Sequence, residues 1–130
     1  MGATSPGDGK RILVAEDEAL ISVILSGDLR DEGYRIAGPF SRGDEALAWL
    51  ADETPDLAIV DYVLRDGPCM ALTRALRERG VPFVIFSGYA RDADAADEFP
   101  ETPWFDKPAS LDDLLAALAE LAERAVPARR

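Results

Sequence analysis

Histidine is absent from this chain of 130 residues, and cysteine occurs only once, at Cys69. Without histidine, the chain has no Ser–His or Cys–His nucleophile pair and lacks the commonest zinc ligand and general base. A single cysteine also excludes an internal disulfide. Any metal that binds here should therefore be a hard cation held by oxygen ligands.

Long apolar runs and an excess of positive charge are missing as well. No run approaches the ~20 apolar residues that a membrane helix needs. Lys and Arg total 14 against 25 Asp and Glu, and the formal net charge is −11. A surface of this charge repels phosphate backbones and anionic lipids, so we expect no direct contact with nucleic acid or membrane. We expect a cytoplasmic protein, whose acidity could equally serve solubility alone.

The composition that remains is that of one globular domain, with 48% hydrophobic and 30% charged residues. Residues 1–9 have no apolar core like that of a signal peptide and predict a flexible lead-in. We assign residues 10–124 to the domain and residues 125–130 to a C-terminal tail.

Short apolar runs alternate with helical patterns along the domain. Strands are predicted at residues 12–15, 35–37, 57–60, 83–86 and 104–105. Helices are predicted from about residue 20 to a stop at Gly33, at about residues 42–51 and 70–79, and from residue 111 toward Pro127, with Ser41 and Ser110 as N-caps. The apolar positions of the first helix are Leu20, Ile21, Ile24, Leu25 and Leu29. Residues 90–103 could form a short helix or a loop.

This alternation predicts an α/β fold in which a parallel sheet is covered by helices on both faces. In such sheets, ligands bind beyond the carboxyl ends of the strands. The residues that follow the predicted strands are Glu16 and Asp17, Gly38 and Pro39, Asp61, Ser87 and Gly88, and Lys107 and Pro108. Each alone is an ordinary turn or cap residue, but carboxylates, a hydroxyl and an ammonium at one edge indicate a functional site.

The three carboxylates, Glu16, Asp17 and Asp61, cannot share one edge of the sheet without a counter-charge. At an effective dielectric constant near ~20, each pair about 4 Å apart costs about 4 kcal/mol. Lys107 supplies one positive charge, whereas Mg²⁺ supplies two and accepts carboxylate oxygens and water as ligands. We therefore predict a Mg²⁺ site built from these three acids.

A metal beside a carboxylate also predicts phosphoryl chemistry. Asp61 can act as a nucleophile and form an aspartyl phosphate. Lys107 and the Ser87 hydroxyl would then contact the phosphoryl oxygens, and Gly88 would leave room for the phosphodonor.

With these residues placed, the chain resembles the receiver domains of two-component response regulators over about residues 10–124. The resemblance rests on the motifs VAED, PDLAIVD, VIFSGY and DKP, and the FSGY segment is similar to that of stand-alone receivers. It implies a flavodoxin-like, five-stranded parallel sheet with strand order 2-1-3-4-5. It also implies that a sensor histidine kinase or a phosphotransfer protein phosphorylates Asp61.

The resemblance further implies the composition of the metal site. Mg²⁺ would be held by Glu16, Asp17, Asp61 and the backbone carbonyl of Val63. The peptide bond between Lys107 and Pro108 would be cis, which an X–Pro bond tolerates.

Some residues depart from the family pattern. The loop after Asp61 reads LRDG, lacks the family's proline and is about two residues shorter, so the third helix could begin differently. Ser87 stands where threonine is commoner, and Trp104 stands at the position of the switch Tyr or Phe. We take Ser87, Trp104 and Tyr89 as switch candidates, although both aromatic residues could equally be ordinary packing residues.

We interpret the chain as a response regulator that catalyses only its own phosphorylation and dephosphorylation and signals by protein contact, as a monomer or a phosphorylation-dependent dimer. The alternative is a Mg²⁺-dependent phosphatase or phosphotransferase with an Asp nucleophile, but Val63 stands where such an enzyme usually needs a second acid. A flavin-binding module is disfavoured because AEDEA is acidic where a phosphate would bind. The chain could be a whole protein or a segment of a longer regulator.

Overall fold

The computed structural model describes residues 9–88, 93–100, 102–107 and 111–128, except for a few side chains in the last two helices. The lead-in up to residue 8, the switch candidate Tyr89, the Lys107–Pro108 peptide bond and the N-cap Ser110 lie outside the described residues. Within the described part, the cis peptide bond is the one between Gly38 and Pro39.

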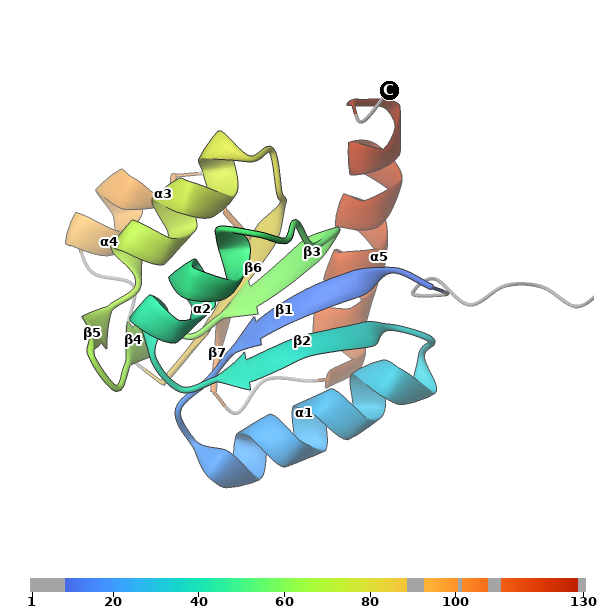
Figure 1. The fold of residues 1–130 in the computed structure, drawn as a ribbon, viewed down its shortest axis with the longest axis horizontal. Helices are drawn as coiled ribbons and strands as arrows, with labels where there is room; N and C mark the ends of the chain where they lie inside the picture. The colour runs from blue at the N-terminus through green and yellow to red at the C-terminus, as the bar shows by residue number, and fades with distance from the viewer. Residues whose placement is uncertain (1–8, 89–92, 101, 108–110, 129–130) are drawn as a thin grey trace, which may run out of the picture.

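Five parallel strands form the central sheet (Figure 1). In order across the sheet they are β2 (Arg35–Phe40), β1 (Arg11–Ala15), β3 (Leu57–Val60), β6 (Phe83–Ser87) and β7 (Trp104–Asp106). Counted among the sheet strands alone, this order is 2-1-3-4-5, so the predicted flavodoxin-like fold is confirmed.

Helices cover both faces of the sheet. One face carries α1 (Ala19–Asp31) and α5 (Leu111–Ala128), and the other carries α2 (Gly43–Leu50), α3 (Met70–Glu78) and α4 (Ala93–Glu98) (Figure 1). The region 90–103, for which the sequence left helix and loop open, thus contains a short helix. Helix α5 passes through Pro127 and reaches into the segment predicted as a tail. None of the described helices is long and apolar enough to cross a membrane.

The sheet separates two hydrophobic layers. Side chains alternate along each strand, so Leu13 and Ala15 of β1 face the layer under α2 and α3 while Ile12 and Val14 face α1 and α5. All four are fully buried. Burial on both faces explains why the central strands are continuous apolar runs.

Helix α1 does not bury all of its apolar positions. Leu25 and Leu29 lie in the core, whereas Leu20 is 72% and Ile24 is 54% exposed, and Val23 beside them is 70% exposed. The apolar residues of this helix extend over a wider arc than the sheet can cover. The apolar pattern predicted the helix but not which of its residues are buried.

The second strand is longer than the three residues predicted. The pairing of β1 with β2 shifts by one residue between Leu13 and Ala15, so β2 continues through Gly38 to Phe40. Gly38 has φ +101°, and a Cβ there would lie 2.8 Å from the Phe40 nitrogen. Gly38 and Pro39 are therefore strand residues inside a bulge, not residues that follow the strand as predicted.

The segment after Asp61 also differs from the expected loop. It forms a small antiparallel hairpin of β4 (Val63–Leu64) and β5 (Gly67–Pro68) before α3 begins at Met70. Helix α2 begins after Arg42, one residue later than the predicted N-cap Ser41, and the Arg42 side chain makes no capping hydrogen bond. A group outside the helix must therefore satisfy its first N–H donors.

Candidate functional site

The predicted strand-end residues converge at the carboxyl edge of the sheet. Glu16 and Asp17 follow β1, Asp61 follows the adjacent strand β3, and Lys107 follows the edge strand β7. The Asp61 amide donates to the Ala15 carbonyl at 2.9 Å, which places Asp61 beside the end of β1. Strand order thus gathers residues that are far apart in the chain.

The Lys107 ammonium lies between these carboxylates. Its Nζ atom is 2.9 Å from both carboxylate oxygens of Glu16, 3.0 Å from Asp61 Oδ2 and 2.9 Å from Glu18 Oε1. The side chains of Lys107, Glu16 and Asp61 are 8%, 2% and 4% exposed, so these contacts are shielded from water. An ammonium that bridges two buried acids offsets repulsion that solvent cannot screen.

Four acids lie close enough to share a metal ion. Glu16, Asp17, Glu18 and Asp61 each offer a carboxylate oxygen, and these oxygens lie within 4.8 Å of one another. The set contains only hard oxygen donors, which fits Mg²⁺. Glu18 belongs to this group and to the Lys107 contacts, yet sequence reasoning did not assign it a role. Its position next to Glu16 and Asp17 in the run EDE could have indicated a role in the site. Only the fold, however, shows that its side chain turns back toward the other acids.

Burial and charge shift the proton affinities of the central pair. Burial raises the pKa of Asp61 to about 7, the negative charge of Glu16 adds to this effect, and the hydrogen bond from Lys107 opposes it. Burial alone would lower the pKa of Lys107, but its hydrogen bonds to Glu16, Glu18 and Asp61 raise it above the usual value. A second cation in the site would favour the charged form of Asp61.

Backbone amides hold two of the carboxylates in place. The Glu18 amide donates to Glu16 Oε2 at 3.0 Å, and the Val63 amide donates to Asp61 Oδ1 at 3.3 Å. The Glu16 amide itself donates to the Phe40 carbonyl at 2.8 Å, so the bulged end of β2 also supports the site.

Ser87 and Gly88 lie at the end of β6, beside the Lys107 segment. The Ser87 side chain is fully buried, and its backbone carbonyl accepts a hydrogen bond of 2.8 Å from the Lys107 amide. Open space surrounds the position that a side chain at Gly88 would occupy. The structure thus brings Ser87 to the same edge as the acids and leaves that edge uncrowded at Gly88.

Trp104 packs against the residue that follows Asp61. Its ring centroid is 5.2 Å from that of Tyr62 and 6.2 Å from that of Phe99, and its indole N–H donates to Asp106 Oδ1 at 3.1 Å. Trp104 is only partly buried. It therefore links the neighbourhood of Asp61 to the end of α4, where Phe99 is fully buried.

This fold and this edge of acids and lysine define a class of protein. The family of response regulator receiver domains matches residues 12–119, which is most of the chain. The chain belongs to this family and is a receiver domain of a two-component response regulator.

Known proteins resemble the chain in sequence and in structure. PdtaR, a transcriptional regulatory protein of Mycobacterium tuberculosis, is 37% identical over 124 residues, which are 90% of this chain and 60% of PdtaR. A CheY-like receiver domain protein of Methanospirillum hungatei JF-1 is 26% identical with a TM-score of 0.83, covering 92% of this chain and 98% of that one. The chain thus spans less than two thirds of PdtaR but nearly all of that receiver domain.

The receiver domain of the sensor histidine kinase PA1611 from Pseudomonas aeruginosa PAO1 has the same fold. Its TM-score is 0.76 at 22% identity, over 88% of this chain and 98% of that domain, and its crystal structure has a magnesium ion in the active site cleft. None of these similarities supports the phosphatase or phosphotransferase alternative.

Proposed function

We propose that Asp61 accepts a phosphoryl group from the phosphohistidine of a histidine kinase or phosphotransfer protein. The observation that carries this proposal is the contact of Lys107 with Asp61 at 3.0 Å, made from opposite sides of the strand β6. A buried carboxylate beside an ammonium and further acids is a nucleophile with its charge partners already in place.

Glu16, Asp17 and Asp61, with the Val63 carbonyl, would hold Mg²⁺. The support is the all-oxygen donor set within 4.8 Å, and the receiver domain of PA1611 holds the same metal in its cleft. When bound, the ion supplies the positive charge that phosphoryl oxygens require.

The residues of the chain then have separate roles in the transfer. An Asp61 oxygen attacks phosphorus, the bond from phosphorus to the histidine nitrogen breaks, and the imidazole leaves with the electron pair. Lys107 pairs with one phosphoryl oxygen and the Ser87 hydroxyl donates to another. Hydrolysis of the aspartyl phosphate by water returns free Asp61, so the domain acts only on its own phosphorylation state.

The phosphoryl group on Asp61 carries roughly −1.5 to −2 units of charge in place of the single charge of the carboxylate. Lys107, which three carboxylates share in this structure, would then turn to the phosphoryl group together with Ser87. We propose that this change spreads to Trp104 and Tyr89, reshapes the surface around α4 and β7, and is read by contact with another protein. We assign residues 10–124 to the receiver domain and residues 125–130 to its tail, into which helix α5 continues as far as Ala128.

The first prediction tests Asp61 directly. Incubation with acetyl phosphate and Mg²⁺ should add one phosphoryl group to the wild-type protein, whereas Asp61→Asn should remain unmodified because an amide is not a nucleophile here. Intact-mass spectrometry measures the product.

The matched control is Asp52→Asn, the same substitution at an exposed aspartate beyond the end of α2. This variant should be labelled like the wild type. Undiminished labelling of Asp61→Asn would show that the acceptor lies elsewhere.

A further inference from the structure

The hairpin of β4 and β5 carries the proposed carbonyl ligand. The Cys69 amide donates to the Tyr62 carbonyl at 2.9 Å, so these two residues form a hydrogen-bonded pair at the base of the hairpin. Val63 and Pro68 are the next pair, and in an antiparallel ladder that pair is not hydrogen-bonded. The Val63 N–H and C=O therefore point away from Pro68.

The direction of the Val63 amide shows what these groups face. Its N–H reaches Asp61 Oδ1 at 3.3 Å, so the outward edge of β4 is turned toward the acids. The N–H and C=O groups of one extended residue point to the same side of a strand. The orientation of this short strand thus decides where the Val63 carbonyl points.

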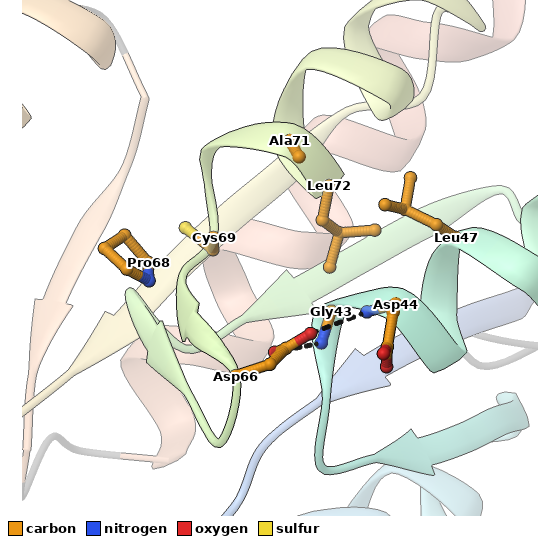
Figure 2. A pocket seen from close by; sticks show the side chains of 8 residues that line it. All are labelled: Gly43, Asp44, Leu47, Asp66, Pro68, Cys69, Ala71 and Leu72. Carbon is orange, nitrogen blue, oxygen red and sulfur yellow. Dashed lines mark hydrogen bonds between the residues drawn. The ribbon is translucent and has the colours of Figure 1, made fainter.

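A hairpin whose two strands have only two residues each does not hold its orientation by itself. Leu64 is buried and anchors the first strand, but a cavity of about 190 Å³ separates α2, the hairpin and the start of α3. Leu47, Cys69 and Leu72 are among the residues that line it (Figure 2). Packing therefore joins the far part of the hairpin to α2 incompletely.

Hydrogen bonds from the turn bridge this gap. Asp66 Oδ1 accepts from the Gly43 amide at 2.7 Å and Asp66 Oδ2 accepts from the Asp44 amide at 3.0 Å (Figure 2). The Arg65 amide donates to the Ser41 carbonyl at 3.0 Å. Asp66 thus provides, from 23 residues away, the capping group that α2 does not receive from Arg42.

We infer that Asp66 is a positioning residue for the metal site: by clamping the turn of the hairpin to the first turn of α2, it fixes the direction of the Val63 carbonyl. This inference rests on the proposed function, because it takes that carbonyl to be a ligand. Asp66 itself does not touch the metal or the phosphoryl group. It acts through the hairpin.

The test measures Mg²⁺ affinity and stability separately. The chain has two tryptophans, so a Trp49→Phe background leaves Trp104, which contacts Tyr62 beside Asp61, as the fluorescent reporter. In this background, Asp66→Ala should raise the Mg²⁺ dissociation constant about tenfold, the loss typical of a residue that orients a ligand. It should also lower the melting temperature because α2 loses its cap.

Asp44→Ala is the matched control for charge. Asp44 lies in the first turn of α2, the turn that Asp66 contacts, and is exposed. Its carboxylate pairs with Arg42 and not with the hairpin. Because an exposed charge is largely screened, its loss should change the dissociation constant by no more than about twofold.

A double variant, Arg42→Ser with Asp66→Ala, separates capping from positioning. Serine at the N-cap can cap α2 locally, and the two changes together leave the net charge unaltered. Stability should return toward the parent value while Mg²⁺ affinity stays weak, because serine caps α2 without restoring the two bonds from Asp66 that tie the hairpin to the helix. If affinity returns together with stability, Asp66 is only a helix cap and the inference is wrong.

The remaining outcomes are also distinct. If the parent protein binds Mg²⁺ and Asp66→Ala binds it equally well, the positioning role is wrong while the proposed function stands. If the parent binds no Mg²⁺ at all, the metal site of the proposed function fails, and this inference fails with it. Should Asp66→Ala not fold, Asp66→Asn keeps one acceptor oxygen and should give an intermediate dissociation constant; an unchanged one would overturn the inference.

Discussion

Lys107 balances the charge of the site at the scale of single residues. Its ammonium contacts Glu16, Glu18 and Asp61, and both Glu16 and Asp61 are buried. A buried carboxylate that loses its positively charged partner still carries the full cost of desolvation. The stability of the buried acids therefore depends on the presence of Lys107.

This dependence predicts a large effect of Lys107→Met. In EDTA, the variant should lose about 3 kcal/mol in free energy of unfolding, because Glu16 and Asp61 stay buried without the ammonium that both of them contact. Added Mg²⁺ should recover part of this loss. Denaturant titration at fixed metal concentration measures both effects.

The control is Lys10→Met, which changes the only other lysine of the chain. Lys10 precedes β1 at the opposite end of the strand from Glu16, so its loss should cost less than ~0.5 kcal/mol. Equal stability of the two lysine variants would contradict a central role of Lys107.

The sequence pattern predicts most of these residues but not all of their contacts. The acids and Lys107 were predicted because each directly follows an apolar run, and parallel strands end at one edge. Glu18 and Asp66 were not assigned roles, because their functions depend on side-chain direction and on a partner segment far along the chain. In a linear pattern both look like ordinary exposed acids.

At the scale of elements, ion pairs of Glu98 with Arg74 and Arg77, here called the ionic clasp, join α4 to α3. Glu98, the last residue of α4, accepts hydrogen bonds from Arg74 and Arg77 of α3 at 2.9 Å, and Arg77 also donates to the Glu98 backbone carbonyl at 2.7 Å. Phe99 follows directly and is fully buried against Phe83. The short helix α4 is thus held at its C-terminal end.

These ion pairs between α3 and α4 predict that the stability of the protein depends on pH. Hydrogen bonds from Arg74 and then Arg77 lower the pKa of Glu98 from 4.5 to about 2. The folded state therefore keeps this carboxylate charged at a pH where the unfolded chain binds a proton, so its stabilisation is full above about pH 4.5 and is lost as pH falls toward 2. The difference in unfolding free energy between wild type and Glu98→Gln should shrink over this range.

Denaturant titrations at several pH values measure this difference, with Glu78→Gln as the control. Glu78 is an exposed residue at the end of α3. A difference for Glu98→Gln that does not change with pH would show that the clasp contributes nothing to stability.

Element prediction from the sequence succeeded where local pattern decides. The strand at 57–60 was predicted with the bounds that β3 has, because its four residues are buried on both faces. The extension of β2 was missed because Gly38 and Pro39 usually end strands, and here a bulge accommodates them. The N-cap of α2 was misplaced because its capping group comes from Asp66, across space rather than from the preceding residue.

At the scale of the molecule, the sheet divides the core into two layers that share every central strand. Ile12 of β1 lies in the layer under α1 and α5, and Ile85 of β6 lies in the layer under α2 and α3. Both are fully buried, and β3 lies between their strands. They belong to one folding unit but do not share side-chain neighbours on the same face.

We expect Ile12→Val and Ile85→Val each to cost about 1 kcal/mol and the double variant to cost the sum within ~0.5 kcal/mol. All variants should unfold in a single transition, because the layers are joined through the sheet. Denaturant titration followed by circular dichroism and by fluorescence checks this. Two separate transitions would show that the layers do not unfold as one cooperative core. A double variant whose cost differs strongly from the sum would show that the two sites are coupled.

The sequence by itself determined the class of fold, the strands of the central sheet and the group of acids and lysine at its edge. It could do so because buried parallel strands are local apolar runs, and because residues that follow such strands meet at one edge whatever the details of packing.

Only the tertiary structure decided which apolar residues of α1 stay exposed, that Lys107 bridges to Glu16 from 91 residues away, and that Asp66 clamps the hairpin to α2. Each of these depends on the distance between segments that are remote in the chain. Such distances are set by how the helices and the hairpin pack on the sheet, which no local pattern of residues specifies.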